Sequence, residues 1–400
     1  MAKTTNTGIA RAGMSFIKSR TSNFAATLSS QVDAFLRTGR RRKNILLVAN
    51  NMLYAIYLHE VAKLFNNDVD VSLKVTANSK SYDSDGAARH LAAALNIETI
   101  GYTAARFRYW DAVFFASPSG ARHFPGAKRK VLINHYLICP KIVDGQHWTY
   151  GPKNTINRKE PIFDLLLEPS HYNKNQATQN NPILENCIAV VGDIRSDRLL
   201  KNAQKRHLYL EKTESANFGN VILVQSTWGA ASLVERFGTD LFEELNRIGQ
   251  KRNWLILVSL HPNHWTGYAN SSVWHHEAEK HESHHLRLIP RQHKWEHYMP
   301  DADLCVTDHT SNAAEFALLR RPIVFCRIPG DAIDQSSLLY KLYAASPVFN
   351  QCNELEEEIE KNIGTPLTPQ QEEVIKDLLS FPGHSKEKTY TAIRGLLKRQ

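Results

Sequence analysis

Polar side chains capable of chemistry follow directly after five apolar runs of the chain. The positions, in chain order, are Asn134-His135, Gly192-Asp193, Ser226 to Gly229, His261 to Asn263 and Asp308 to Asn312. Each apolar run has the length and composition of a buried β-strand. Because ligands of parallel α/β sheets bind at the carboxyl ends of the strands, these positions are the first candidates for binding and catalysis.

The stretch VTDHTSNAAEF, residues 306–316, is the most densely polar of these strand ends. Asn312 and Glu315 form a capping pattern, so we expect a helix to begin at Asn312. The N–H groups and partial positive charge of a helix start favour a phosphate, and the hydroxyls of Thr310 and Ser311 can donate to its oxygens. We therefore predict a phosphate site, which consists of Thr310, Ser311, Asn312, Asp308 and Thr227. Two alternatives remain open: a helix cap without a ligand, and Asp308 as a brace of the turn.

Two histidines occupy matching strand ends in the two halves of the chain. His261 follows the run WLILVSL, and His135 follows VLIN. Histidine exchanges protons near neutral pH, so each is a candidate general acid, general base or hydrogen-bond donor to phosphate. We predict that they face one another across a shared site. The alternative is that each is a hydrogen-bonded structural residue.

The elements that must position these residues are short apolar strands separated by helical stretches. This alternation predicts an α/β fold with two doubly wound, Rossmann-like domains that face one another across a cleft. We place a basic arm at 1–43, a first domain at 44–180, a second domain at 181–385 and a C-terminal helix at 386–400; the polar segment 170–182 is predicted to be a linker. The chain has no GxGxxG, GxxxxGK or GxSxG motif, which removes support for an oxidoreductase, a P-loop kinase or a serine hydrolase.

Positive charge is concentrated in the arm. Residues 1–43 hold nine Lys or Arg and one acid, whereas the rest of the chain holds 40 basic and 39 acidic residues. A basic groove for nucleic acid is therefore not predicted. Apolar residues recur at helical spacing before the basic run that ends at Lys43; they are Phe24, Leu28, Val32, Phe35 and Leu36. The pattern favours a helix on an anionic membrane surface, and a solvated extension or a transit peptide are the alternatives.

Several classes of site and location are disfavoured. The five cysteines are scattered without a CxxC pair, as in a reduced cytosolic protein. No apolar run could span a bilayer and no signal peptide opens the chain, so we expect a cytoplasmic protein, peripheral at the inner face of the membrane. The histidine-rich segment 275–285 lacks metal-site spacing, and the DVD (68–70) and DAD (301–303) pairs precede their strands. We therefore predict no metal and no cofactor.

The strand-end motifs make the second half of the chain resemble the CDP-glycerol glycerophosphotransferases. This is the teichoic-acid and capsule polymerase family, which has the GT-B fold. VVGDIRSDRLL (190–200) resembles the family's Gly-x-Pro-Arg-x-Asp segment, with Ile194 in place of the proline. VILVQSTWG (221–229) and SLHPN (259–263) resemble its Ala-Pro-Thr-Trp and His-Pro motifs, and residues 306–325 its Thr-Asp-x-Ser-Ser segment, helix and strand. NHYLICPK (134–141) keeps only the histidine of a Trp-His-Gly motif, and the family's Arg-Gly-Phe-Tyr-like segment is absent.

The resemblance implies transfer of a glycerol-phosphate, or a related polyol-phosphate or sugar group, from a CDP-activated donor. The acceptor would be a hydroxyl of a glycan or lipid-linked molecule in cell-surface polymer synthesis. It also implies that the donor pyrophosphate lies at Thr310 and Ser311 with His261 assisting, and that His135 is the base. The nucleotide base would meet a loop that consists of Leu288, Ile289, Pro290 and Arg291.

Rival functions come from the same fold and from its two-domain shape. A UDP-sugar-dependent GT-B glycosyltransferase and a UDP-sugar 2-epimerase-like enzyme would share the polar turn before a phosphate-binding helix. A two-domain ligand-binding protein of the periplasmic type would share the cleft, and the absence of a signal peptide disfavours it.

Overall fold

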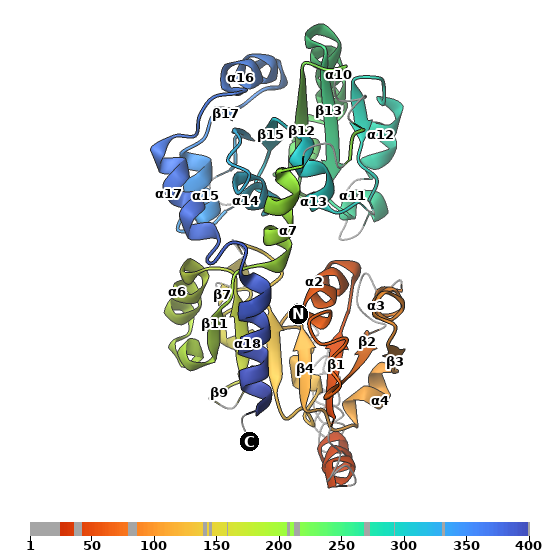
Figure 1. Cartoon of the computed structure of the whole chain (residues 1–400). Coiled ribbons are helices and arrows are strands. Elements are labelled where there is room, and N and C mark those ends of the chain that lie inside the picture. The colour runs from red at the N-terminus through yellow and green to blue at the C-terminus, as the bar shows by residue number, and fades with distance from the viewer. Residues whose placement is uncertain are drawn as a thin grey trace, which may run out of the picture.

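Two parallel β-sheets form the two halves of the chain in the computed structural model (Figure 1). The structure describes residues 25–35, 42–78, 86–138, 142–143, 146–157, 159–205, 209–211, 217–267, 273–291, 293–329 and 333–398. The strands of each sheet end toward the other half of the molecule, and the helices that follow several of them lie at this junction. This arrangement confirms the predicted fold of two doubly wound α/β domains.

The first sheet has seven strands in the order β11-β10-β5-β4-β1-β2-β3, and every neighbouring pair is parallel. Its strands are β1 (Lys43–Val48), β2 (Val71–Thr76), β3 (Glu98–Thr99), β4 (Ala112–Phe115), β5 (Lys130–Ile133), β10 (Leu165–Glu168) and β11 (Ile188–Val190). Alternate residues of β1 enter different cores, with Ile45 and Leu47 on one face and Leu46 and Val48 on the other. Burial on both faces explains why these strands are uninterrupted apolar runs in the sequence.

Helices cover both faces of the first sheet. They are α2 (Met52–Ala62), α3 (Ala87–Leu95), α4 (Tyr102–Arg106), α5 (Pro152–Thr155), α6 (His171–Asn180) and α18 (Ser385–Lys398), with 3-10 turns η1 (Ala121–His123) and η2 (Pro182–Cys187). Short antiparallel pairs join β6 (Ile142–Val143) to β7 (Gln146–His147) and β8 (Ile156–Asn157) to β9 (Glu160–Pro161). The C-terminal helix α18 returns to this domain, since Ile393, Leu396 and Leu397 belong to its core.

The second sheet has six parallel strands in the order β14-β13-β12-β15-β16-β17. They are β12 (Asn220–Ser226), β13 (Trp254–Leu260), β14 (Leu286–Leu288), β15 (Leu304–Thr307), β16 (Ile323–Cys326) and β17 (Val348–Phe349). The helices are α9 (Leu233–Phe237), α10 (Thr239–Arg252), α11 (Asn263–Thr266), α12 (His275–Lys280), α13 (Trp295–Tyr298), α14 (Asn312–Ala317), α15 (Leu338–Ala344), α16 (Leu355–Asn362) and α17 (Pro369–Leu378), with η4 (Met299–Asp301) and η5 (Cys352–Glu354). The strand order reverses between β12 and β15, as it does between β1 and β4 in the first sheet, and such a reversal opens a crevice for a ligand.

The boundary between the domains differs from the sequence-based one. The polar segment taken as a linker is helix α6, whose Ser170 cap accepts a hydrogen bond from the Asn173 amide. It returns the chain to the first sheet, where β11 pairs with β10, so β11 does not open the second domain. Few residues of α6 need burial against the sheet, and its polar composition therefore resembles that of a loop.

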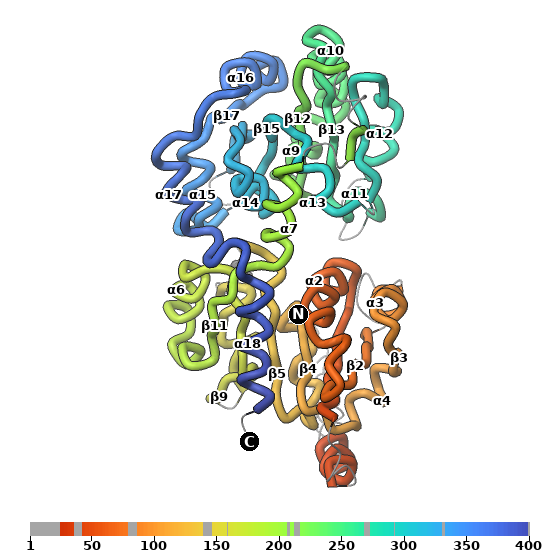
Figure 2. The backbone as a smooth tube through the Cα atoms, viewed as in Figure 1, coloured from red at the N-terminus to blue at the C-terminus, as the bar shows by residue number. Residues whose placement is uncertain are grey.

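The chain crosses between the domains at α7 (Ile194–Ala203), shown in green in Figures 1 and 2. Asp193 caps this helix by accepting from the Ser196 amide at 2.8 Å. Ile194 belongs to the core of the first domain and Leu199 to that of the second. Gly192 before the helix has φ +79°, and a Cβ there would lie 2.7 Å from the Ser380 carbonyl oxygen, so the crossing requires glycine.

The described part of the N-terminal arm, residues 25–35, is helical and lies at the end of the first domain away from the second (Figure 1). Asp33 accepts a hydrogen bond from the Tyr109 amide at 3.0 Å, which docks one face of the helix. The opposite face exposes Leu28, Val32 and Phe35 by 56%, 54% and 77%. Phe24 and Leu36 lie outside the described residues. Across the described chain, every helix is too short or too polar to cross a bilayer.

Candidate functional site

Asp308 follows β15 and ties together the two loops at the switch point of the second sheet. Its carboxyl group accepts hydrogen bonds from the amides of Leu233 (2.7 Å), Thr227 (3.0 Å) and Thr310 (3.1 Å), and from the Ser226 hydroxyl (3.2 Å). Burial raises its pKa to about 6, and these hydrogen bonds oppose the rise. Asp308 therefore braces the turn, which is the alternative to phosphate binding that the sequence analysis left open.

The turn that Asp308 holds leads into α14. The helix begins at Asn312, as predicted, but its cap is Ser311, whose side chain makes no capping hydrogen bond within the described structure. The Thr310 hydroxyl accepts weakly from the Asn312 amide at 3.4 Å. The expected capping box does not form: Glu315 is 2% exposed, and one oxygen of its carboxyl group is buried without a hydrogen-bond partner among the described residues.

His261, at the end of β13, has a defined tautomer. The Asn263 amide donates to its Nδ1 atom at 3.1 Å, so in the neutral ring the proton resides on Nε2. Burial, and then the neighbouring His264, lowers the pKa of His261 to about 3. At neutral pH this residue is consequently an uncharged N–H donor. The Trp228 ring lies 6.0 Å from the His261 ring between centroids.

His135, after β5, has the opposite hydrogen-bonding character. Its side chain bonds the backbone of Ala116 in a contact that raises its pKa, as a ring N–H donating to a carbonyl does. Burial dominates and lowers the pKa to about 4. The rings of Tyr136, Tyr54 and Tyr57 pack around it edge-on, with centroids at 4.5, 5.1 and 6.2 Å. Because the ring is neutral at pH 7, one of its nitrogens carries a proton and the other has a lone pair.

A buried carboxyl group that the sequence analysis missed supports the end of β5. Glu168, 1% exposed at the end of β10, accepts from the Asn134 side chain at 2.7 Å and from the Tyr150 hydroxyl at 2.8 Å. Burial raises the pKa of Glu168 to about 7. The signal in the sequence was a polar residue closing the apolar run LLLE (165–168), a strand that we did not identify.

A network of charged side chains joins the two domains, and the sequence analysis missed it too. Arg195 of α7 is 2% exposed and donates to Glu296 of α13 at 2.6 Å. Its guanidinium lies between the rings of Tyr57 (4.6 Å) and Trp295 (4.3 Å). Arg198 of α7 pairs with Glu60 of α2 and with Glu296 of α13. These two ion pairs hold the first domain to the second.

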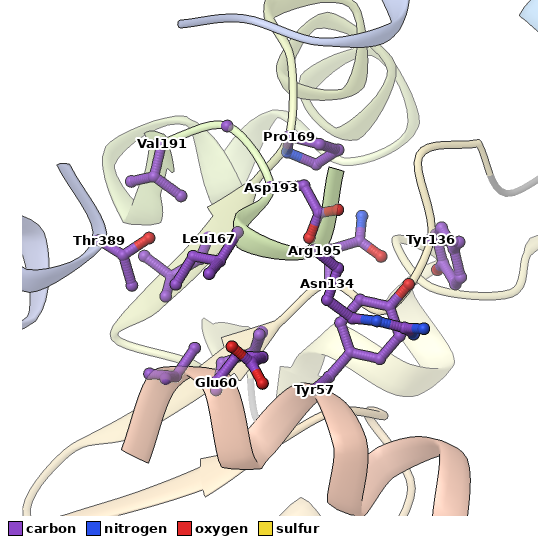
Figure 3. Close-up of a pocket in the computed structure, with 14 residues that line it drawn as sticks. Tyr57, Glu60, Asn134, Tyr136, Leu167, Pro169, Val191, Asp193, Arg195 and Thr389 are labelled. Atoms are coloured by element: carbon purple, nitrogen blue, oxygen red, sulfur yellow. The ribbon is translucent and has the colours of Figure 1, made fainter. Parts of the chain in front are cut away.

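A cavity of about 30 Å³ lies beside this network (Figure 3). In Figure 3, Tyr57 and Glu60 rise from α2 toward Arg195 and Asn134. The volume suits a single water molecule rather than a nucleotide. The cavity is lined by residues of α2, by Asn134 and Tyr136 on either side of His135, and by Asp193 to Arg195, where the chain crosses between the domains.

The predicted nucleotide-base loop follows β14, the strand beside the one that carries His261. The Ile289 amide donates to the Val258 carbonyl at 2.8 Å. Leu288 and Ile289 are buried, whereas Pro290 is half-buried and Arg291 is exposed. The loop thus shares a sheet edge with His261.

The side chains that could bind a metal ion lie away from the strand ends that carry His135 and His261. The DVD and DAD pairs precede β2 and β15, as predicted, and Asp301 and Asp303 accept hydrogen bonds from the amides of Leu210 and Val221. On α12, ligand atoms of His275, His276 and Glu279 lie within 4.8 Å of one another.

Two doubly wound domains with their polar strand ends turned toward each other define the GT-B class of fold. The chain belongs to the CDP-glycerol:poly(glycerophosphate) glycerophosphotransferase family, whose model matches residues 144–365, more than half of its length. This match covers His261 and the turn at 308–312, and His135 lies before it. None of the curated proteins compared matches the chain.

Solved structures share the fold at low sequence identity. The wall teichoic acid polymerase TagF, as a histidine-to-asparagine variant soaked with CDPG, superimposes with a TM-score of 0.61 at 13% identity, over 99% of both chains. The UDP-GlcNAc 2-epimerase of Methanocaldococcus jannaschii, in complex with UDP-GlcNAc and UDP, gives 0.56 at 14% identity, over 88% of this chain and 99% of that one. At these identities the likeness shows the fold.

Proposed function

We propose that the protein transfers glycerol phosphate from CDP-glycerol to a hydroxyl group of a glycan or lipid-linked acceptor. Membership of the glycerophosphotransferase family supports this class of reaction. The observation that carries the proposal is the pair of neutral strand-end histidines: His261 is an N–H donor, and the neutral ring of His135 has a nitrogen lone pair. Transfer to a hydroxyl needs these two properties, one at the donor phosphates and one at the acceptor.

The second domain binds the donor in this proposal. The pyrophosphate lies against Thr310, Ser311 and the first amides of α14, within a turn that Asp308 and the Thr227 amide keep rigid. His261 donates its Nε2–H to a phosphate oxygen. The cytosine base lies along the loop that consists of Leu288, Ile289, Pro290 and Arg291.

The first domain activates the acceptor. His135 takes the proton of the acceptor hydroxyl, and the oxygen attacks the phosphorus atom that carries glycerol. The bond from this phosphorus to the bridging oxygen breaks, and CMP leaves with the electron pair. The hydrogen bonds of His261 and of the α14 amides stabilise the charge that develops on CMP.

The reaction proceeds without a metal ion in this mechanism, because N–H and O–H donors offset the phosphate charge. Turnover should persist after dialysis against EDTA. A complete loss of turnover that added Mg²⁺ or Mn²⁺ reverses would rule out the metal-free mechanism.

An anionic membrane on the cytoplasmic side brings the acceptor within reach. The exposed side chains of Leu28, Val32 and Phe35 form one apolar face, and the sequence that follows is rich in arginine up to Lys43. Such a face binds at the lipid headgroups, and neighbouring cations strengthen the attachment. Sedimentation with vesicles containing phosphatidylglycerol tests this attachment, with Val32→Asp as the variant and neutral vesicles as the control. Equal sedimentation of variant and parent would show that this helix does not attach the protein to the membrane.

Thermal shift with a panel of nucleotides tests the proposal directly. CDP and CDP-glycerol should raise the melting temperature more than UDP and UDP-GlcNAc, and CDP-glycerol with a polyol-phosphate acceptor should release CMP. The structural likeness to UDP-GlcNAc 2-epimerases makes UDP-GlcNAc the informative competitor. Stabilisation by UDP-GlcNAc alone would favour an epimerase or UDP-sugar transferase, and no response to any nucleotide would reject both.

A further inference from the structure

His264 is a fully buried histidine on α11, the short helix that follows His261. Its side chain is 0% exposed, and its Nε2 atom lies 2.9 Å from the carbonyl oxygen of Thr227. A carbonyl oxygen only accepts hydrogen bonds, so Nε2 carries a proton and is the donor. Thr227 follows β12, the strand beside β13. The His264 ring therefore connects the loop after β13 to the loop after β12.

The backbone of His264 is held as well as its ring. Its amide donates to the His261 carbonyl at 2.9 Å, while the Asn263 amide donates to Nδ1 of His261. The His264 carbonyl oxygen accepts from Nδ1 of His275 on α12 at 3.1 Å. The ring of Trp265 stacks on that of His275, with 4.8 Å between centroids. His261 and His264 thus belong to one closed turn, which contacts from α12 support.

The backbone of Thr227 receives contacts from two other strand ends. Its amide donates to Asp308, after β15, at 3.0 Å, and its carbonyl group accepts from His264, after β13. The Ser226 hydroxyl lies 3.1 Å from the same carbonyl oxygen and 3.2 Å from the Asp308 carboxyl group. A hydroxyl group has one proton and can serve one of these acceptors at a time. His264 therefore supplies the Thr227 carbonyl with a donor whichever acceptor Ser226 serves.

We propose that His264 is a positioning residue, which holds the loop at 227–229 against the turn that carries His261. Trp228 of this loop lies 6.0 Å from the His261 ring between centroids, so loss of the His264 contact would shift a neighbour of that ring. It would also loosen the link between His261 and the phosphate turn that Asp308 braces. The inference rests on the proposed function for its effect on turnover, whereas the contact itself can be tested without substrate.

Hydrogen–deuterium exchange tests the contact in two variants of His264. His264→Leu removes the donor, and His264→Gln is the matched control because it keeps an N–H group at similar reach. We expect faster exchange of peptides that contain residues 226–234 in the His264→Leu protein and nearly parental exchange in the His264→Gln protein. Peptides from β1, in the first domain, should be unchanged in both, which excludes global loosening. Equal exchange at 226–234 in all three proteins would overturn the contact.

Kinetics with CDP-glycerol as the varied substrate then test positioning. We expect His264→Leu to lower kcat by about 10- to 100-fold, because a small displacement of a catalytic group has effects of this size. KM for the donor should stay within about threefold, and His264→Gln should recover most of kcat. A large rise in KM with kcat retained would assign His264 to donor binding and overturn the proposal. Faster exchange with unchanged kcat would show that the contact does not serve catalysis.

A double-mutant cycle separates positioning from a structural role. If His264 acts through His261, its replacement should have little effect once His261 is absent. We expect His264→Leu to change kcat by less than about threefold in the His261→Ala protein, against about 10- to 100-fold in the parent. Equal fold-losses in the two backgrounds would show that His264 acts independently of His261 and would overturn the proposal.

His264→Phe provides a second route if the His264→Leu protein does not fold. It keeps an aromatic ring in the buried space and removes the donor, so kcat should fall again with the donor KM retained. Parental kcat in this variant would overturn the proposal. If the parent itself releases no CMP from CDP-glycerol, the proposed function fails, and the exchange experiment still decides whether His264 holds the loop.

Discussion

The ends of β5 and β13 carry the same residue type in two different hydrogen-bonding states. At β13, a backbone amide donates to Nδ1 of His261 and leaves a proton on Nε2. At β5, the backbone of Ala116 raises the pKa of His135, which favours a proton on the ring nitrogen facing it, and the other nitrogen of the neutral ring has a lone pair. Burial keeps both rings neutral near pH 7, since their pKa values fall to about 3 and about 4.

This difference teaches that the local backbone, and not the histidine itself, assigns the role. Pro262 follows His261 and turns the chain into α11, which aims the Asn263 amide at the ring. His135 instead has the backbone of Ala116 as its neighbour, directly after β4, the strand that pairs with β5. One strand end therefore suits phosphate oxygens, and the other suits an acceptor hydroxyl.

Replacement of His135 should have the largest effect on turnover. His135→Ala removes the proposed base, which contributes about 10²- to 10⁴-fold in enzymes of known mechanism. We expect kcat for CMP release to fall by this factor, while CDP-glycerol still raises the melting temperature as it does in the parent. A loss of donor binding with kcat retained would place His135 on the donor side and remove the contrast between the two strand ends.

Substitution of His261 should sharpen the contrast through a comparison of two variants. His261→Ala removes the N–H donor, and a missing donor of this kind costs about 10²- to 10³-fold in kcat. His261→Gln restores an N–H group at similar reach, so it should recover part of the rate. Steady-state kinetics on both proteins decide the point. Equal losses in the two variants would show that proton transfer, and not hydrogen-bond donation, is the task of His261.

Much of the fold could be predicted because buried parallel strands are legible as apolar runs. The apolar runs at 45–48, 131–134 and 221–226 coincide with β1, β5 and β12 to within two residues at either end. The start of α17 is legible in the same way, since Thr368 and Gln371 have the sequence pattern of a capping box around a proline and form one in the structure. Helix α6 and strand β11 were misplaced, because a polar crossover helix and a linker share one composition.

The candidate site was predictable only in part, for a physical reason. Strand ends are local features, so the turn at 308–312 and the two histidines could be found without coordinates. The partners of Arg195 come from α2 and α13. Such contacts depend on how the domains are oriented, and local sequence patterns carry no information about that orientation.

The pH dependence of kcat/KM should show the smallest effect, because burial has already moved the titration of His135. A base must be deprotonated, so a pKa of about 4 keeps His135 active as the pH falls from 7.5 to 5. Over this interval its contribution should change by roughly 10%, whereas an exposed histidine with a pKa of about 6.5 would lose about 30-fold. The measurement is the initial rate of CMP release at low CDP-glycerol, after a control that the protein stays folded at pH 5. An acidic limb near pH 6.5 that vanishes in a His135→Asn variant would mean that the His135 ring is hydrated in the working enzyme, and the two strand ends would then differ in solvation as well as in hydrogen-bonding state.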